Sequence, residues 1–188
     1  MKVKGLPFNF SPIPTVGDGS CFIHAVIQGF CPPYHKLSQK EKMLLAKSVR
    51  NDLALTLQDD PIYKSLSRGE IEEISKNVKE MSKQYMQAYL VSGHWINMSF
   101  IELISNIFDI NIIIVSNKTK DFYYSGDPEI YFKKRRESVF IYYYDNAHFE
   151  TMAIETTDGH KTLFDSKSQI VKESMKRLFQ NKIIMPKK

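Results

Sequence analysis

The hydrophobic pattern of this 188-residue chain changes near residue 110, and no other feature constrains the fold as strongly. Before that point, apolar residues recur at three- and four-residue spacing, which is typical of amphipathic helices. After it come the short apolar runs NIIIV (111–115) and SVFIYYY (138–144), which are typical of strands. Helices followed by strands predict an α+β domain, with a helical N-terminal part packed on a small central mixed or antiparallel sheet.

Turn and capping signals delimit the first two predicted helices. The first covers residues 21–30 and is ended by the CPPY stretch at 31–34. Ser38 and Glu41 have the spacing of a capping box, so the second helix is expected to open there. Asp60, followed by a proline, is expected to close it.

A third, longer helix is predicted over residues 68–91, with Gly93 ending it. Its inward face is expected to consist of Ile71, Ile74, Val78, Met81, Tyr85 and Tyr89. A short apolar helix follows over 100–108, where Ser99 and Glu102 repeat the capping-box spacing.

The C-terminal part predicts further strands and one more helix. Residues 122–125 and 148–155 are expected to be strands, and TTDGHK at 156–161 a hairpin turn. A last helix is expected over about 166–179. By contrast, the first fifteen residues are expected to form an extended arm, since Pro7, Pro12 and Pro14 prevent regular structure there.

Composition narrows the class of protein. A chain of this length suits a single domain whose core needs no disulfides. Two cysteines, Cys21 and Cys31, form neither a disulfide framework nor a structural zinc site alone, which fits a reducing compartment. No apolar stretch has the length of a signal peptide core or a membrane span. The net charge of +5 is spread out except for KKRR at 133–136, which we interpret as a solvated loop, so nucleic acid is not favoured as a partner.

The stretch VGDGSCFIHAV at 16–26 places Cys21 at the start of the first helix. A helix N-terminus carries unpaired N–H groups and a partial positive charge, which lower the pKa of a thiol. Glycines before the cysteine allow a sharp turn that leaves amides facing a reacting atom, as in an oxyanion hole. Two interpretations remain open from the residues alone: a cysteine nucleophile, and a buried cysteine that packs as a small hydrophobic residue.

A cysteine nucleophile needs a general base, and His148 is the best placed of the five histidines. It begins a predicted strand, and Glu150 shares its face because side chains at i and i+2 of a strand point the same way. A strand-edge histidine beside a surface glutamate is the alternative. The remaining histidines are less suited: His24 has no evident polar partner, His94 adjoins Trp95 in a loop, and His35 and His160 lie in turns.

Three ordered segments resemble the ovarian tumour (OTU) family of deubiquitinating cysteine proteases. DGSC at 18–21 with the following FIHAVIQGF resembles the catalytic cysteine box of that family, of the form Asp-Gly-polar-Cys. HWINMSFIELISNIFDINIIIV at 94–115 resembles its central stretch, and NAHFETMAI at 146–154 its histidine box. The resemblance covers about residues 12–155. It implies a papain-like cysteine protease fold.

The resemblance also implies roles for individual residues. Cys21 matches the nucleophile and His148 the general base, while Asp18, Gly19 and Ser20 match the loop that forms the oxyanion hole. Glu150 stands where the family usually has Asp or Asn as the third catalytic residue. Because glutamate is one methylene longer, orientation of the ring by Asp18 or by Asn146 stays open as an alternative.

For the reaction, the resemblance implies hydrolysis of isopeptide bonds after the C-terminal glycine of ubiquitin, with Trp95 and Phe149 as candidates to line a narrow channel for the ubiquitin tail. It implies neither a metal nor an organic cofactor. The expected partners are ubiquitin or polyubiquitin chains and other ubiquitin-like modifiers, but no membrane, and a monomer is expected. The alternatives are a cysteine protease for another ubiquitin-like substrate and a catalytically degenerate ubiquitin-binding module.

The domain is expected to span residues 16–165, between the extended arm (1–15) and a C-terminal helix and tail (166–188). The composition, rich in Ile, Lys and Asn, suits a viral or bacterial member that acts on host ubiquitin. The expected localisation is then the cytoplasm, which is the host cytoplasm for such a protein.

Overall fold

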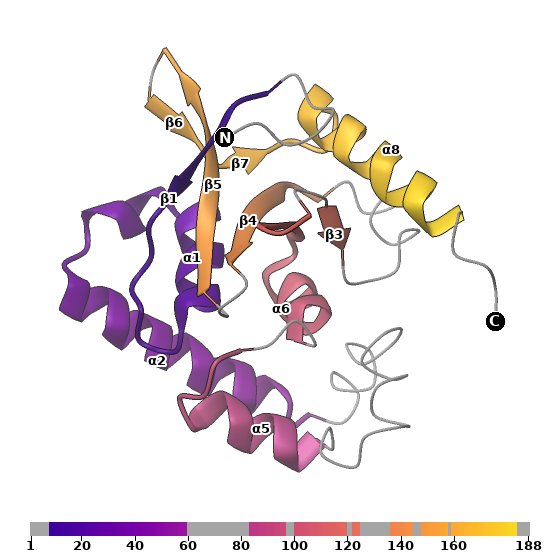
Figure 1. The fold of residues 1–188 in the computed structure, drawn as a ribbon. Helices are drawn as coiled ribbons and strands as arrows, with labels where there is room; N and C mark the ends of the chain where they lie inside the picture. The colour runs from indigo at the N-terminus through magenta and orange to yellow at the C-terminus, as the bar shows by residue number, and fades with distance from the viewer. Residues whose placement is uncertain are drawn as a thin grey trace.

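The computed structural model describes residues 8–59, 83–96, 100–119, 122–124, 136–144, 148–157 and 159–183. Within these residues the chain folds as helices packed on both sides of one central sheet (Figure 1). The predicted α+β class is therefore confirmed.

The sheet is mixed. Its strands run in the order β1-β5-β4-β2-β3, with β6 paired to β5 and β7 to β4. Only the pairing of β2 with β4 is parallel among the described strands; the other pairings are antiparallel. The strands are β1 (Phe10–Ile13), β2 (Asn111–Ser116), β3 (Phe122–Tyr124), β4 (Ser138–Tyr144), β5 (His148–Thr156), β6 (Gly159–Lys161) and β7 (Leu163–Phe164).

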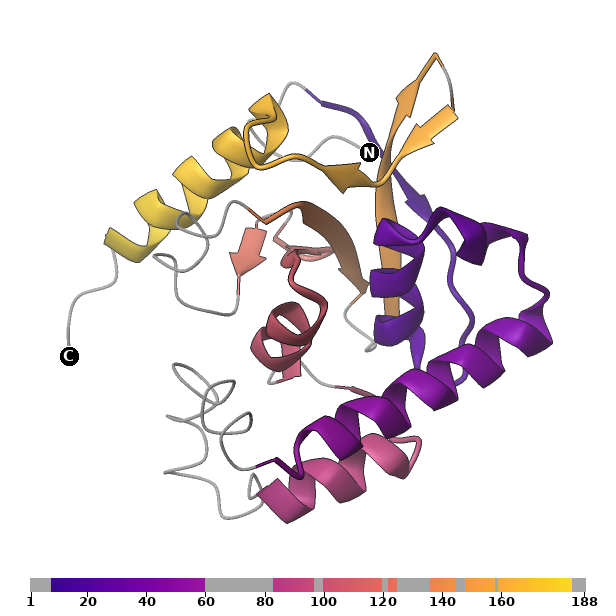
Figure 2. The same ribbon diagram turned by 180° about the vertical axis from the view of Figure 1, so that it is seen from behind.

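Helices cover both faces of the sheet, most of them on one side. The helices are α1 (Cys21–Phe30), the 3-10 helix η1 (Pro32–Lys36), α2 (Gln39–Thr56), α5 (Lys83–Val91), α6 (Ile101–Phe108) and α8 (Gln169–Ile183). One face packs against α1 and α6, with the paired helices α2 and α5 outside them, and the other packs against α8 (Figures 1 and 2). The predicted boundaries of α1 and β4 are confirmed, and those of α2, α6, α8, β2, β3 and β5 agree within a few residues.

Strand β2 lies between β4 and β3 and is buried on both faces, and its sequence explains why. Side chains alternate between the faces of a strand. Ile112 and Ile114 join the cluster under α1 and α6, whereas Ile113 and Val115 join the cluster under α8. A run of β-branched residues without polar alternation is what a strand buried on both faces requires.

The N-terminal arm is shorter than expected. Residues 10–13 form β1, which pairs with β5 so that Pro12 lies opposite Met152. The expectation that prolines exclude regular structure was wrong for these residues. Because β1 is the edge strand of the sheet, the missing N–H of Pro12 can be tolerated there.

The predicted capping box of α2 is confirmed, whereas the predicted inward face of the third helix is partly wrong. The capping box of Ser38 and Glu41 is confirmed at the start of α2. Residues 60–82 and 97–99 lie outside the described residues. They include most of the third predicted helix, the predicted end of α2 at Asp60 and the predicted cap at Ser99. In α5 the buried residues are Met86 and Leu90, while Tyr85 is 40% exposed, because the first pair faces α2.

Arg136 is also placed differently from the prediction. The residue is buried, and its guanidinium donates to Asp109 Oδ1 (2.6 Å) and to Asn106 Oδ1 (2.8 Å) at the end of α6. The last residue of the KKRR block thus anchors the start of β4 rather than a solvated loop, and the three before it lie outside the described residues. None of the helices that the structure describes is both long enough and apolar enough to span a membrane.

Candidate active site

Helix α1 carries Cys21 as its first residue, and the whole helix is a central buried element. Every residue from Cys21 to Gly29 is buried, which explains why FIHAVIQGF is apolar except at His24 and Gln28. A Cβ added at Gly29 would lie 2.8 Å from Val139 Cγ1, so the glycine lets α1 approach the sheet closely. The hydroxyl of Thr151 in β5 donates to the carbonyl of Ala25 at 2.7 Å.

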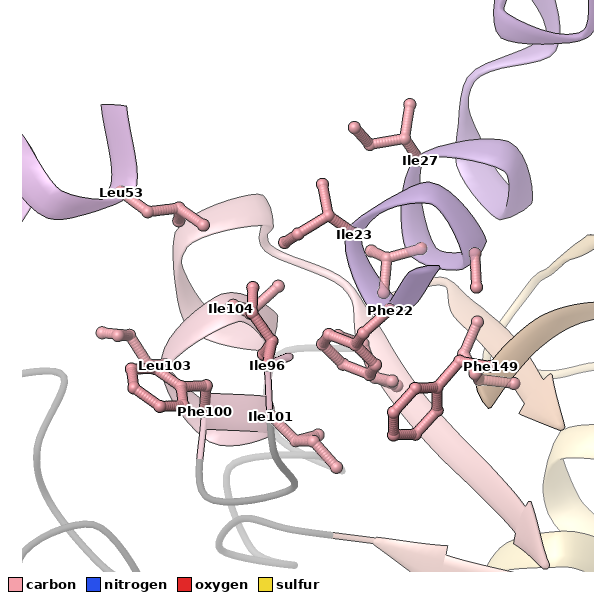
Figure 3. Close-up of a cluster of buried hydrophobic side chains, with 14 of the residues drawn as sticks. Phe22, Ile23, Ile27, Leu53, Ile96, Phe100, Ile101, Leu103, Ile104 and Phe149 are labelled. Atoms are coloured by element: carbon pink, nitrogen blue, oxygen red, sulfur yellow. The ribbon is translucent and has the colours of Figure 1, made fainter. Parts of the chain in front are cut away.

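These contacts bring the start of α1 to the start of β5. Figure 3 shows Phe22, beside the nucleophile candidate, facing Phe149 of β5, and the ring centroids lie 5.1 Å apart. The backbone N–H of Phe149 hydrogen-bonds to the Cys21 thiol, and this bond acts to lower the pKa of the thiol. His148 directly precedes Phe149, so the predicted base lies one residue from a backbone group that contacts the predicted nucleophile.

Burial raises the pKa of the Cys21 thiol above its ordinary value. The backbone N–H groups of Phe149 and Phe22 act in the opposite direction, and the negative charge of Asp18 adds to the rise. The expectation that the helix N-terminus lowers this pKa was therefore wrong in its net direction, because the side chain is only 5% exposed and desolvation outweighs the amides.

His148 and Glu150 share one face of β5, as predicted. His148 Nε2 lies 3.7 Å from Glu150 Oε1, with the imidazole about one third exposed and the carboxylate mostly buried. Tyr144, opposite His148 across the β4–β5 pair, donates its hydroxyl to Glu150 Oε2 at 2.8 Å. Burial, together with this hydrogen bond, raises the pKa of Tyr144 to about 12. The glutamate is thus held in position, while Asn146 lies outside the described residues.

Asp18 contacts α1 through His24. Its Oδ1 accepts the N–H of Ser20 at 2.9 Å and lies 3.0 Å from Nε2 of His24. The other ring nitrogen of His24, Nδ1, lies 2.5 Å from the hydroxyl of Tyr34. The ring therefore donates through Nε2–H to the carboxylate and accepts from the tyrosine. The contacts of Asp18 thus hold the loop before Cys21, and neither of these two hydrogen bonds of its carboxylate goes to His148.

His24 was expected to lack a polar partner, and that expectation was wrong. The residue is fully buried. Burial lowers its pKa, although the hydrogen bond and the charge of Asp18 act to raise it. The sequence does hold a signal for this arrangement: His24 and Gln28 are polar positions four apart in an otherwise apolar helix, which marks buried groups that need partners.

The loop of residues 17–20, here called the cysteine loop, is held tightly. Gly19 has a φ of +83°, and a Cβ added there would lie 2.7 Å from the Gly93 carbonyl oxygen, so only glycine fits. The N–H of Ser20 is already bonded to Asp18. This bond excludes the N–H of Ser20 as an oxyanion donor and leaves those of Asp18, Gly19 and Cys21 as candidates.

The two aromatic candidates for a tail channel differ in their surroundings. Trp95 is 53% exposed, and its indole lies against Gly19, where an added Cβ would be 3.3 Å from Cδ1. Trp95 also lines an open hollow of about 640 Å³ together with Tyr85, Tyr89 and His94. Phe149 is only 3% exposed and packs its ring on Phe22 and Tyr143, so its side chain belongs to the core and does not line an open channel.

Sequence reasoning also missed Arg50 of α2, which contacts the cysteine loop. Its guanidinium Nη1 lies 3.4 Å from both the Gly19 carbonyl oxygen and the Ser20 hydroxyl. The signal was present in the spacing, because Ala46, Arg50 and Leu53 fall on one buried face of α2. A cation on an apolar helix face indicates a buried group that is paired.

No cluster of three or more His, Cys, Asp or Glu side chains suited to a metal ion occurs among the described residues. The sequence model of one protein family, the OTU-like cysteine proteases, matches residues 16–153, which include Cys21, His148 and Glu150. The chain belongs to this family. The matched range includes both the cysteine loop and the start of β5.

Solved structures with this OTU fold resemble the protein over most of its length. An OTU domain in complex with ubiquitin is 16% identical, with 91% of this chain and 83% of the other covered and a TM-score of 0.59. The OTU domain of OTUD1 is 14% identical, with 77% and 85% covered and a TM-score of 0.51. The viral OTU domain protease of Dera Ghazi Khan virus is 16% identical, with 78% and 82% covered and a TM-score of 0.50. No curated protein sequence matches the chain.

Proposed function

We propose that this OTU-like cysteine protease is a deubiquitinase that hydrolyses isopeptide bonds after the C-terminal glycine of ubiquitin. Cys21 is the nucleophile, His148 the general base and Glu150 the residue that orients it. The observation that carries the proposal is the meeting of α1 with β5, in which the Phe149 N–H contacts the Cys21 thiol next to His148.

Proton transfer to His148 starts the reaction. Because burial raises the pKa of Cys21, the resting group is a neutral thiol. The neutral imidazole takes the thiol proton as the sulfur attacks the glycine carbonyl carbon, which forms a tetrahedral oxyanion. The N–H groups of Gly19 and Cys21 stabilise that negative charge.

Collapse of this intermediate breaks the bond to the lysine amine, and the imidazolium of His148 gives its proton to that leaving nitrogen. A thioester between Cys21 and ubiquitin remains. His148 then takes a proton from water, whose oxygen attacks the thioester carbonyl. The products are free ubiquitin with a C-terminal carboxyl group and the restored thiol of Cys21.

Glu150 supports the charged form of His148. A carboxylate 3.7 Å from Nε2 stabilises an imidazolium, and the Tyr144 hydrogen bond fixes that carboxylate. This geometry supports Glu150 as the third member of the catalytic set, where the resemblance to the family implies Asp or Asn. The longer side chain reaches back to the tyrosine on the neighbouring strand.

Ubiquitin is the substrate we favour, because an OTU domain of the same fold has been solved in complex with ubiquitin. The position of Trp95 against Gly19 supports a role as one wall of the channel for the two terminal glycines of ubiquitin. Glycine has no side chain, so such a channel can be narrow.

The test is incubation of the protein with ubiquitin that carries a C-terminal electrophile, compared with Cys21→Ala and His148→Ala. We expect a covalent adduct with the wild type, none with Cys21→Ala and at least tenfold slower formation with His148→Ala. Binding of ubiquitin without an adduct would indicate a degenerate reader of ubiquitin instead. An adduct only with another modifier, presented in the same form, would change the substrate.

A further inference from the structure

Arg50 is a buried cation that joins three separate segments of the chain. It lies on α2 and is 3% exposed. Its guanidinium donates to the carbonyl oxygens of Leu90 (2.6 Å), Tyr89 (3.2 Å), His94 (2.7 Å) and Gly19 (3.4 Å), and to the Ser20 hydroxyl (3.4 Å). These acceptors belong to the end of α5, to the loop that follows it and to the cysteine loop.

The acceptors explain how a charge can be buried here. Tyr89 and Leu90 lie in the last turn of α5, whose terminal carbonyls have no partner within the helix and carry partial negative charge. The guanidinium supplies donors to these groups in a fixed, planar fork. Four carbonyl oxygens and one hydroxyl thus compensate the desolvation of Arg50.

At the cysteine loop, Arg50 and Asp18 act on the same peptide group. The carbonyl oxygen of Gly19 accepts from Arg50, and the N–H of Ser20 donates to Asp18. Carbonyl and N–H of this one peptide are held from opposite directions, so the peptide plane cannot flip. The N–H groups of Gly19 and Cys21, on either side of it, are oriented as a consequence.

We propose that Arg50 is a positioning residue for the oxyanion donors. It also couples the cysteine loop to the loop of residues 92–96, which carries Trp95. The inference rests on the proposed function only for the expected effect of Arg50 on the rate of ubiquitin hydrolysis. Through His94, Arg50 fixes the loop that presents Trp95, and through Gly19 it fixes the donors. Arg50 touches no reacting atom and acts through the backbone of both loops.

The test compares Arg50→Lys, which keeps the charge but loses the fork, with Arg136→Lys as a matched control. Arg136 is also buried and hydrogen-bonded, so its replacement disturbs the fold in a similar way. It lies before the start of β4, and His148 pairs with the last residue of that strand, Tyr144. From Ser138 to Tyr144 the strand spans about 20 Å, so Arg136 is remote from His148. With a ubiquitin C-terminal fluorogenic amide, we expect kcat of Arg50→Lys to fall at least tenfold while KM changes less than threefold. The control is expected to keep kcat within twofold.

Alkylation of Cys21 by iodoacetamide, followed by peptide mass spectrometry, separates positioning from general damage. Alkylation forms no oxyanion, so its rate in Arg50→Lys is expected to stay within twofold of wild type. An unchanged kcat in the folded variant would overturn the proposal, as would an equal loss of alkylation rate and kcat.

Amide hydrogen exchange tests the inference without any substrate. We expect exchange at least tenfold faster in peptides that cover 16–22 and 92–96 of Arg50→Lys, but not of Arg136→Lys. If wild type is inactive on ubiquitin, the proposed function fails, and this comparison of exchange rates alone decides the role of Arg50. Unchanged exchange in Arg50→Lys refutes that role.

If Arg50→Lys does not fold, Ser20→Ala replaces that variant. Its kcat is expected to fall at least threefold at constant KM, and an unchanged kcat refutes the role of Arg50.

Discussion

Nε2 of His24 lies 3.0 Å from Oδ1 of Asp18, so the histidine three residues after Cys21 is bonded to the carboxylate three residues before it. The nucleophile candidate is thus bracketed by a pair that ties the cysteine loop to the buried helix behind it. Tyr34, on the other side of the ring, completes a chain of hydrogen bonds from η1 to the Ser20 N–H. The loop is thus tied to a fully buried imidazole of α1.

The first prediction concerns stability at mildly acidic pH. Burial lowers the pKa of His24, so the unfolded chain takes up a proton at a higher pH than the folded one, near the ordinary value of about 6.5. The stability from neutral His24 is present above that pH and is lost as pH falls toward the folded pKa, by at most about 1.4 kcal/mol per pH unit.

Urea unfolding at pH 7 and pH 5 measures this effect. The free energy of unfolding of the wild type is expected to fall more between these values than that of His24→Gln, which keeps a donor for Asp18. His160→Gln is the control, because His160 lies exposed in β6. Equal pH dependence in wild type and His24→Gln would contradict the prediction.

Gly19→Ala is expected to destabilise the fold and to abolish most activity. The φ of +83° alone costs about 1–2 kcal/mol for a residue with a Cβ, and the 2.7 Å approach to the Gly93 carbonyl displaces the loop further. Gly17→Ala is a matched control, since a Cβ there meets no atom within 4 Å. Thermal unfolding and turnover of both variants decide the point; similar losses in the two would refute it.

The reactivity of Cys21 is expected to rise toward alkaline pH. Because burial raises its pKa, half of the thiol is ionised only at a pH above the ordinary thiol value of about 8.5. Alkylation by iodoacetamide from pH 6 to 10, read at the Cys21 peptide, should therefore have a midpoint above that value. A midpoint below pH 8 would instead indicate a resting ion pair with His148.

Glu150→Gln is expected to lower kcat at least tenfold with little effect on KM, because the variant loses the charge beside the His148 imidazolium. Tyr144→Phe removes only the hydrogen bond to Glu150 and is expected to cost a smaller, roughly threefold factor. Steady-state kinetics of both variants measure this order. A larger loss in Tyr144→Phe than in Glu150→Gln would show that Glu150 is not the orienting group.

Trp95→Ala and Phe149→Ala should fail in different ways. Phe149 is buried between Phe22 and Tyr143, so its removal is expected to destabilise the fold by about 3–5 kcal/mol. Trp95 is half exposed, so Trp95→Ala is expected to change stability by no more than about 0.5 kcal/mol while KM for ubiquitin rises several-fold. Unfolding curves and kinetics of the two variants distinguish core from channel.

Local chemistry made much of the fold predictable from the sequence. The start of α2 follows from the capping box, and β2 from its run of β-branched residues, since each signal lies within a few neighbouring positions. Strand β1 was missed because its partner is β5, about 140 residues away, where no local pattern registers the pairing. Prolines that break most strands are tolerated at that edge.

The shared strand face of His148 and Glu150 was predictable from the sequence, but the electrostatics of the candidate site was not. Spacing placed His148 and Glu150 on one face, and the structure confirms it. The direction of the Cys21 pKa depends on how far the surrounding helices exclude water, which local sequence does not encode. Arg50 needed acceptors 30 to 44 residues away, so its role became visible only once α2 and α5 were packed together.

Strand β1 also affects the solubility of any shortened form of the protein. The family match begins at residue 16, and β1 therefore lies outside it. Removal of the first fifteen residues would leave the backbone groups of β5 unpaired opposite residues 10–13. Exposed strand edges recruit strands from other molecules and promote aggregation. Trimming the protein to its family boundaries would thus turn β5, which carries His148, into an unpaired edge strand that favours aggregation.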